Sequence, residues 1–210
     1  NLPDGSEYSP GWVLNFVESS NSFDLSHQGV VDALSLFEAT TANVWWQVGA
    51  TDGEWFPSLD FYGSGQVEVP NNDNLNFGTG DFALSLWYKS YGQWDSLQVA
   101  QQLLAKHDGG SDSYELQLWI ENDGMVFLTG IVGDDLLVAD VPFRERRLSH
   151  LVLSRSNGLV SMYIDGENVG QMESAGNTTS NGNLVLGYDT YSDGENLRGS
   201  MTDVTVYSSG

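Results

Sequence analysis

The sequence contains no cysteine, so disulfide bonds, thiolate metal sites and a cysteine nucleophile are all excluded. It also has little positive charge, with 7 basic residues against 29 acidic ones and a formal net charge of −22. A field of this sign repels phosphate backbones and anionic lipid surfaces, which argues against nucleic acid as a partner and against direct membrane insertion. No apolar run approaches the roughly 18 residues that a membrane-spanning helix needs.

The excess of carboxylates has two interpretations that the composition alone leaves open. It can serve only to keep the protein soluble. It can also mark a domain that works in salt water or binds divalent cations, where carboxylates are screened or coordinated. The chain begins at Asn1 and not at Met, from which we expect that a leader or upstream sequence has been removed and that the chain is part of a larger multidomain protein.

The stretch from Leu59 to Ser90 carries the clearest strand pattern. Strict alternation places every second residue on one face of a half-buried strand. From residue 81 to residue 89 the inner face is apolar, and the opposite face reads Asp81, Ala83, Ser85, Trp87 and Lys89. The apolar face consists of Phe82, Leu84, Leu86 and Tyr88. This pattern predicts a strand with one face in the core.

Short strand patterns recur along the chain and are separated by Gly, Asn and Asp turns. They cover residues 44–48, 67–69, 99–106, 114–121, 125–129, 136–141, 150–155, 159–165, 184–187 and 201–207. Residues 29–39 fit a short helix or loop, and also a strand. Such short strands with frequent turns predict an all-β fold, a jelly-roll sandwich of two antiparallel sheets. We expect one domain over 1–210, in which 1–58 supplies the first strands and loops.

Several motifs in these strands resemble those of laminin-G-like domains, which belong with the concanavalin A-like lectins and pentraxins. The first is L-D-F-x-G-S-G-x-V-x-V-P from Leu59, followed by G-D-F-x-L-S-x-W from Gly80. Later ones are Y-I-D-G from Tyr163 and G-S-M-x-D-V-x-V-Y from Gly199. The resemblance implies a concanavalin A-like sandwich whose opening strand pairs with the last strand. His150 matches the His of a further family motif, H-x-V. Two places before it, where the family usually has a Trp, this sequence has Leu148.

Acidic loops are the candidates for a calcium site, because Ca²⁺ takes six to eight oxygen ligands from flexible loops. Three loops qualify: Asp108 with Asp112, Asp134 with Asp135, and Asp189 with Asp193 and Glu195. In laminin-G-like domains an Asp just before the strand that begins Y-x-L-x-L commonly binds calcium, and Asp112 occupies that place. The resemblance therefore implies a calcium cofactor near Asp108 and Asp112. The alternative is that these residues only form turns.

Exposed aromatic residues are the candidates for ligand binding. Trp87 lies on the face opposite the core in its strand, and Glu115, Gln117 and Trp119 share the corresponding face of residues 114–121. An indole beside amide and carboxylate groups can stack on a sugar ring and hydrogen-bond its hydroxyls. Trp94, in a predicted loop, is a further candidate. Alternatively, the indoles pack beneath neighbouring loops.

Catalysis is the competing interpretation. Retaining glycosidases need two carboxylates about 5 Å apart, but Glu115 and Glu121 would lie roughly 20 Å apart along a strand. A Ser-His-Asp hydrolase is not supported either, because the sequence has no G-x-S-x-G elbow. His107, in the acidic loop, fits either a ligand or a solvated side chain.

We therefore predict a non-catalytic module that binds a glycan or glycoconjugate on a cell surface or matrix, in a calcium-dependent adhesion protein outside the cell. Two alternatives stay open: a glycosidase or polysaccharide lyase on the same fold, and a structural spacer in a large surface protein. The sandwich fold alone does not decide among them.

Overall fold

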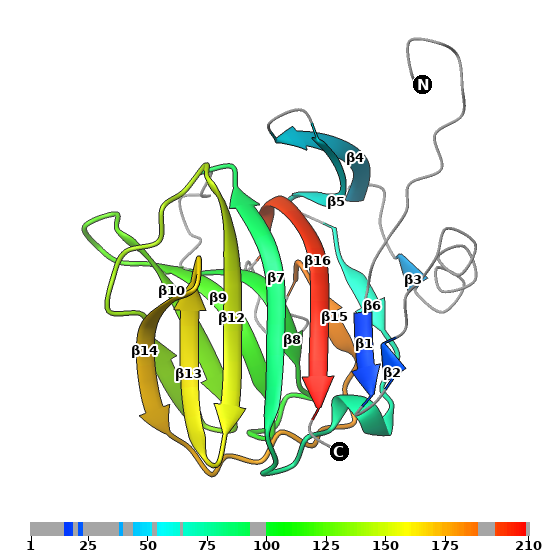
Figure 1. Cartoon of the computed structure of the whole chain (residues 1–210), viewed down its shortest axis with the longest axis vertical. Helices are drawn as coiled ribbons and strands as arrows, with labels where there is room; N and C mark the ends of the chain where they lie inside the picture. The colour runs from blue at the N-terminus through cyan, green and yellow to red at the C-terminus, as the bar shows by residue number, and fades with distance from the viewer. Residues whose placement is uncertain are drawn as a thin grey trace.

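The computed structural model describes residues 15–18, 21–22, 38–39, 44–51, 54–63, 65–92, 100–188 and 196–208. Two sheets are stacked, and the nine-stranded sheet A lies in front of the seven-stranded sheet B in Figure 1. Within the described residues, no helix is long and apolar enough to span a membrane. The predicted all-β sandwich is thus confirmed.

Sheet A follows the order β14-β13-β12-β7-β16-β1-β2, with β5 paired to β16 and β4 paired to β5. These strands are β14 (Glu167–Glu173), β13 (Leu159–Ile164), β12 (Leu148–Ser156), β7 (Phe82–Ser90), β16 (Arg198–Ser208), β1 (Asn15–Glu18), β2 (Asn21–Ser22), β5 (Glu54–Tyr62) and β4 (Val44–Thr51). Sheet B follows the order β11-β10-β9-β8-β15-β6-β3. Its strands are β11 (Asp135–Val138), β10 (Val126–Val132), β9 (Tyr114–Ile120), β8 (Ala100–Lys106), β15 (Leu184–Leu186), β6 (Val67–Val69) and β3 (Glu38–Ala39), and one 3-10 turn, η1, covers Asp73–Leu75.

The core lies between the inner faces of the two sheets, as the alternation predicts. In sheet A, Leu84 of β7 pairs with Leu153 of β12, which in turn pairs with Met162 of β13. Leu116 and Leu118 of β9 face them from sheet B, and all five side chains are fully buried. The faces predicted for residues 81–89 and 114–121 are therefore confirmed.

Strand β16 forms the centre of sheet A. It pairs with β7 on one side, and with β1 and β5 on the other. The pairing with β1 is parallel and joins residues 15–17 to residues 205–207, so the expected contact between an opening strand and the last strand is present. Of residues 29–39, only Glu38 and Ala39 lie within the described ranges, as strand β3. The pattern gave no hint of β14, an edge strand that buries only Val169 and Gly170.

Two buried cations hold the loops at one end of the sandwich. The Arg155 guanidinium donates to the carbonyl oxygens of Gly80 (2.8 Å), Gly78 (2.7 Å) and Gly176. The Lys106 ammonium donates to the Asn76 side chain (2.8 Å) and to the Ser180 carbonyl (2.7 Å). Both side chains are fully buried. Buried charge is tolerated only when it is hydrogen-bonded in this way.

At the edge of the sandwich, residues 139–143 connect sheet B to sheet A. The amide of Ala139 donates to Leu128 O (2.9 Å), and that of Asp140 donates to Val169 O (2.6 Å) in β14. The amide of Phe143 donates to Val126 O (2.7 Å), and the Phe143 side chain is buried. This connecting segment is thus fixed to both sheets.

Candidate functional site

The predicted ligand-binding residues fall on both outer faces of the sandwich. Glu115, Gln117 and Trp119 project from β9 on the outer face of sheet B, since the intervening residues of β9 are buried. Trp87 projects from β7 on the outer face of sheet A. The structure therefore does not bring Trp87 together with the other three. Trp94 lies outside the described residues.

On sheet B, Trp119 is the ligand candidate that solvent reaches best, with 37 % of its surface exposed. Its register partner in β10 is Phe127, and its partner in β8 is Ala100, which is too small to cover an indole. Gln117 is only 6 % exposed, because Gln102 and Thr129 flank it. Glu115, between Ile131 and Ala105, is half-buried. A ligand can thus reach Trp119 and, in part, Glu115.

A hollow of about 430 Å³ lies beside Phe127, the register partner of Trp119, and we call it the corner hollow. It is lined by Glu121, Asn122, Asp123, Met125, Phe127 and Val138. Met125, Val138 and the nearby Leu136 are all exposed apolar residues. The sequence reasoning missed these residues, although Leu136 and Val138 alternate with the buried Leu137 and could have been assigned to an outer face.

On sheet A, Trp87 belongs to a second polar and aromatic cluster. Its ring lies 5.0 Å from that of His150, its register partner in β12. The His150 Nε2 atom shares a hydrogen bond of 2.7 Å with the Ser85 hydroxyl. A Ser–His pair becomes a hydrolase triad only when a carboxylate accepts a hydrogen bond from the other ring nitrogen.

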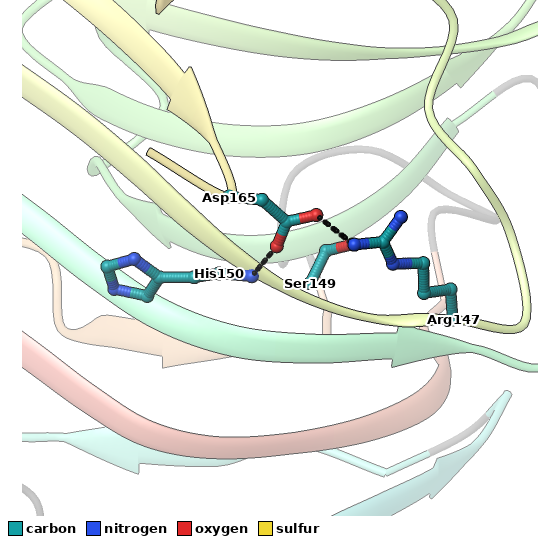
Figure 2. A network of polar contacts seen from close by, with 4 residues as sticks. All are labelled: Arg147, Ser149, His150 and Asp165. Carbon is teal, nitrogen blue, oxygen red and sulfur yellow. Dashed lines mark hydrogen bonds and ion pairs between the residues drawn. The ribbon is translucent and has the colours of Figure 1, made fainter. Parts of the chain in front are cut away.

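The Asp165 carboxylate contacts the backbone of His150, not its ring. Asp165 Oδ1 accepts a hydrogen bond of 2.9 Å from the main-chain amide of His150. Asp165 Oδ2 lies 3.3 Å from Arg147 and accepts from the Ser149 hydroxyl at 3.3 Å. Figure 2 shows the imidazole pointing away from this carboxylate. Asp165 therefore does not complete a Ser-His-Asp relay with Ser85 and His150.

The same Asp165 lines a larger hollow of about 710 Å³, which we call the rim pocket. It lies where the connecting segment meets the β12, β13 and β14 side of sheet A. Its lining consists of Val141, Pro142, Phe143, Arg144, Arg147, Ser149, Ile164, Asp165, Glu167 and Val169. In the sequence, this pocket corresponds to a basic run at residues 144–147 and to the Y-I-D-G motif, and neither pattern indicates a cavity.

The Asp108–Asp112 loop joins a neighbouring loop through Asp108. Its two carboxylate oxygens accept hydrogen bonds from the amides of Gly110 and Asn181, each at 3.3 Å. Asp112 is exposed, as are Asp134 and Asp135. Among the described residues, no group of three His, Asp or Glu side chains is placed to hold a metal ion. The third predicted calcium loop, with Asp189, Asp193 and Glu195, lies outside the described residues.

Comparison with known proteins agrees with this fold. A laminin G-type family model, described as the concanavalin A-like lectin/glucanases superfamily, matches residues 61–209. The chain belongs to this superfamily. A comparison with curated protein sequences gave no match.

Solved structures similar to this superfamily member include both binding domains and enzymes. Domain 4 of AbnA, an extracellular GH43 arabinanase from Geobacillus stearothermophilus in complex with arabinotriose, has a TM-score of 0.59 and 16 % identity over 80 % of this chain and 76 % of that chain. The binding domain of Paraclostridial Mosquitocidal Protein 1 has a TM-score of 0.60 and 14 % identity over 94 % of this chain and 48 % of that chain. The alginate lyase Aly36B has a TM-score of 0.53 and 11 % identity over 96 % of this chain and 98 % of that chain. At such identities the likeness shows the fold alone.

Proposed function

We propose that this domain is a non-catalytic module that binds a neutral polysaccharide on the outer face of sheet B. The observation that carries the proposal is the exposed Trp119 indole beside Phe127 and the corner hollow. An aromatic face stacks on the apolar face of a sugar ring, while nearby amides and carboxylates hydrogen-bond its hydroxyl groups. Glu121, Asn122 and Asp123 supply such groups at the hollow.

The charge of the domain favours a neutral glycan over an anionic one. The formal net charge is −22, and the corner hollow is lined by two carboxylates and no basic side chain. A sulfated or uronate-rich chain would be repelled by this field, except where salt screens it. Neutral sugars pay no such electrostatic cost. The arabinotriose complex of the similar arabinanase domain is an example of this ligand class.

The surroundings of the carboxylates near Trp119 favour binding over hydrolysis. On the outer face of sheet B, Glu115 lies about 14 Å from Glu68 at the usual strand spacing, and the register partner of Glu68, Glu38, lies in the edge strand β3. Glu121 and Asp123 both line the corner hollow, which makes a glycosidase or lyase the second candidate. Both side chains are exposed, however, and Asp123 accepts from the Met125 amide as a turn former (2.9 Å). Neither lies in the apolar pocket that tunes a general acid.

The cellular setting and the calcium ion belong to the same proposal. The domain would act outside the cell, within a larger protein, and present this face to a glycan of a cell surface or matrix. The extracellular arabinanase domain and the laminin domains among similar structures support this setting. Calcium, held through Asp112, would rigidify loops at the end of the sandwich and would not contact the sugar on sheet B.

The test is affinity electrophoresis through gels that contain arabinan, xylan, mannan or soluble starch, with alginate as the anionic comparison. We expect retardation in at least one neutral gel, none in alginate at low salt, and loss of retardation in Trp119→Ala. A parallel assay for reducing ends should stay flat. Release of reducing ends that depends on Glu121 would replace the binding proposal with the enzyme alternative. If the protein migrates equally in all gels and releases no reducing ends, both the binding proposal and the enzyme alternative are overturned.

A further inference from the structure

The corner hollow and the rim pocket lie on the two sides of the same connecting segment. Val138 lines the corner hollow and Val141 lines the rim pocket. The two residues are three positions apart, so at most ~10 Å of chain separates them. Their side chains are 42 % and 47 % exposed. Together with the exposed Asp140 between them, they form a ridge between the two cavities.

This ridge does not move independently of the cavities. The backbone of residues 139–143 is hydrogen-bonded to β10 through Leu128 and Val126, and to β14 through Val169. Both hollows therefore keep a fixed spacing, and a ligand that enters both meets a preorganised surface. Preorganisation reduces the ordering cost of binding.

The rim pocket is lined by equal numbers of cationic and anionic side chains. Two guanidinium groups, Arg144 and Arg147, face two carboxylates, Asp165 and Glu167, so the charged lining sums to zero in a chain of −22. Such a lining favours neither an anion nor a cation. It matches a polyhydroxyl ligand, whose groups donate to carboxylates and accept from guanidinium.

The polar groups of the pocket are held in place around Asp165. Its carboxylate accepts from the buried Ser149 hydroxyl, from the His150 amide and from Arg147 (Figure 2). A guanidinium has five donor hydrogens, so the Arg147 contact leaves others for a ligand. The buried Phe143 and Val169 give the pocket an apolar wall. These are the features of a sugar subsite.

We propose that the rim pocket is a second subsite of one extended glycan site, reached over the Val138–Val141 ridge. This proposal rests on the proposed function and narrows the class of ligand. The ligand would be a neutral polysaccharide that is recognised along its length, and not a single terminal sugar. One or two sugar units would lie on Trp119 and the corner hollow. Further units would cross the ridge, and the next would enter the pocket beside Arg147 and Asp165.

The experiment compares trisaccharides with hexasaccharides of arabinan, xylan, mannan and starch by isothermal titration calorimetry. For the bound chain type, we expect the hexasaccharide to bind about tenfold more tightly than the trisaccharide. Arg147→Gln and Asp165→Asn should abolish that advantage and leave trisaccharide affinity unchanged, whereas Trp119→Ala should weaken both ligands. Asn is chosen at 165 because it tolerates the positive φ of 53° found there. Lys89→Gln, an exposed cation on sheet A, is the matched control and should change nothing.

The outcomes separate the inference from the proposed function. If Trp119→Ala abolishes binding but the two lengths bind equally, the corner site stands and the rim subsite is wrong. If no saccharide binds, the proposed function fails, and this inference fails with it. Should a pocket variant not fold, Val141→Trp on the exposed ridge gives the same test, because a bulky side chain there would obstruct only the longer ligand.

Discussion

Trp87 and Trp119 project from opposite outer faces of the sandwich, and the two side chains are almost equally exposed (36 % and 37 %). Trp87 also has an aromatic neighbour, His150, at 5.0 Å, whereas Trp119 has Phe127 beside it and a cavity next to that ring. The two indoles are therefore a matched pair, in which one serves as the control for the other.

From this relationship we predict different effects of the two alanine variants. Trp119→Ala should weaken polysaccharide binding by at least about tenfold, within the range for the loss of an aromatic anchor. Trp87→Ala should leave the dissociation constant within about twofold, since its face is separated from the corner hollow by the whole core. Isothermal titration calorimetry with the polysaccharide that binds most tightly in the gel assay measures the dissociation constant of each variant. A larger loss in Trp87→Ala would move the site to sheet A, around His150.

Arg155→Lys should destabilise the fold, because an ammonium cannot reach the three carbonyl oxygens that the guanidinium holds. We expect the free energy of unfolding to fall by about 3 kcal/mol, the loss of one or two hydrogen bonds to a buried charge. Urea denaturation measures the change. The exposed pair of Arg147 with Asp165 provides the control, and Arg147→Lys should cost less than about 1 kcal/mol. Equal effects would show that the carbonyl contacts of Arg155 add no stability.

The stability of the fold should increase with pH between about 8 and 10, because of Lys106. Burial lowers the pKa of Lys106 to about 8, against the smaller opposing effect of Asp108. In that interval the unfolded chain still holds the Lys106 proton, which the folded chain has released, so the free energy of unfolding rises, by at most about 1.4 kcal/mol per pH unit. Above pH 10 the trend should reverse. There the unfolded tyrosines ionise, whereas burial raises the pKa of Tyr88 and Tyr114 in the folded state.

Urea titrations at half-unit pH steps test this dependence. Lys106→Met removes the titrating group but keeps a long side chain, so the rise between pH 8 and pH 10 should disappear in that variant. The fall above pH 10 should persist in both proteins. A rise of the same size in Lys106→Met would assign it to another group.

Calcium should raise the melting temperature through Asp112, a prediction that comes from the acidic loop and the family resemblance. An ion that binds only the folded state adds about 2.7 kcal/mol at a hundredfold excess over its dissociation constant. Scanning calorimetry with calcium and then with chelator measures the shift, which Asp112→Ala should remove. Glu173→Gln, at an exposed carboxylate outside the three candidate loops, is the control and should keep most of it. A melting curve that chelator does not change would leave Asp112 as a turn residue.

The sequence predicted which face of a strand is buried better than it predicted which sheet the strand belongs to. Alternation identifies the buried side of Leu84 and of Leu118 because burial follows a period of two along each strand. The same alternation places Trp87 and Trp119 outward without specifying the sheet, which depends on pairings between distant segments. The sequence identifies Asp165 only as part of the Y-I-D-G motif, because its contact with Arg147 and its place in the rim pocket arise when the connecting segment packs against sheet A.

The position of β16 has a consequence for how the chain is made. This strand covers one edge of β7, but it consists of residues 198–208, whereas β7 ends at Ser90. During synthesis, that edge of β7 therefore stays open until more than a hundred further residues have left the ribosome. Open strand edges recruit other chains, and pairings between distant segments form slowly. The nascent domain thus depends on protection of β7 until the sheet can close.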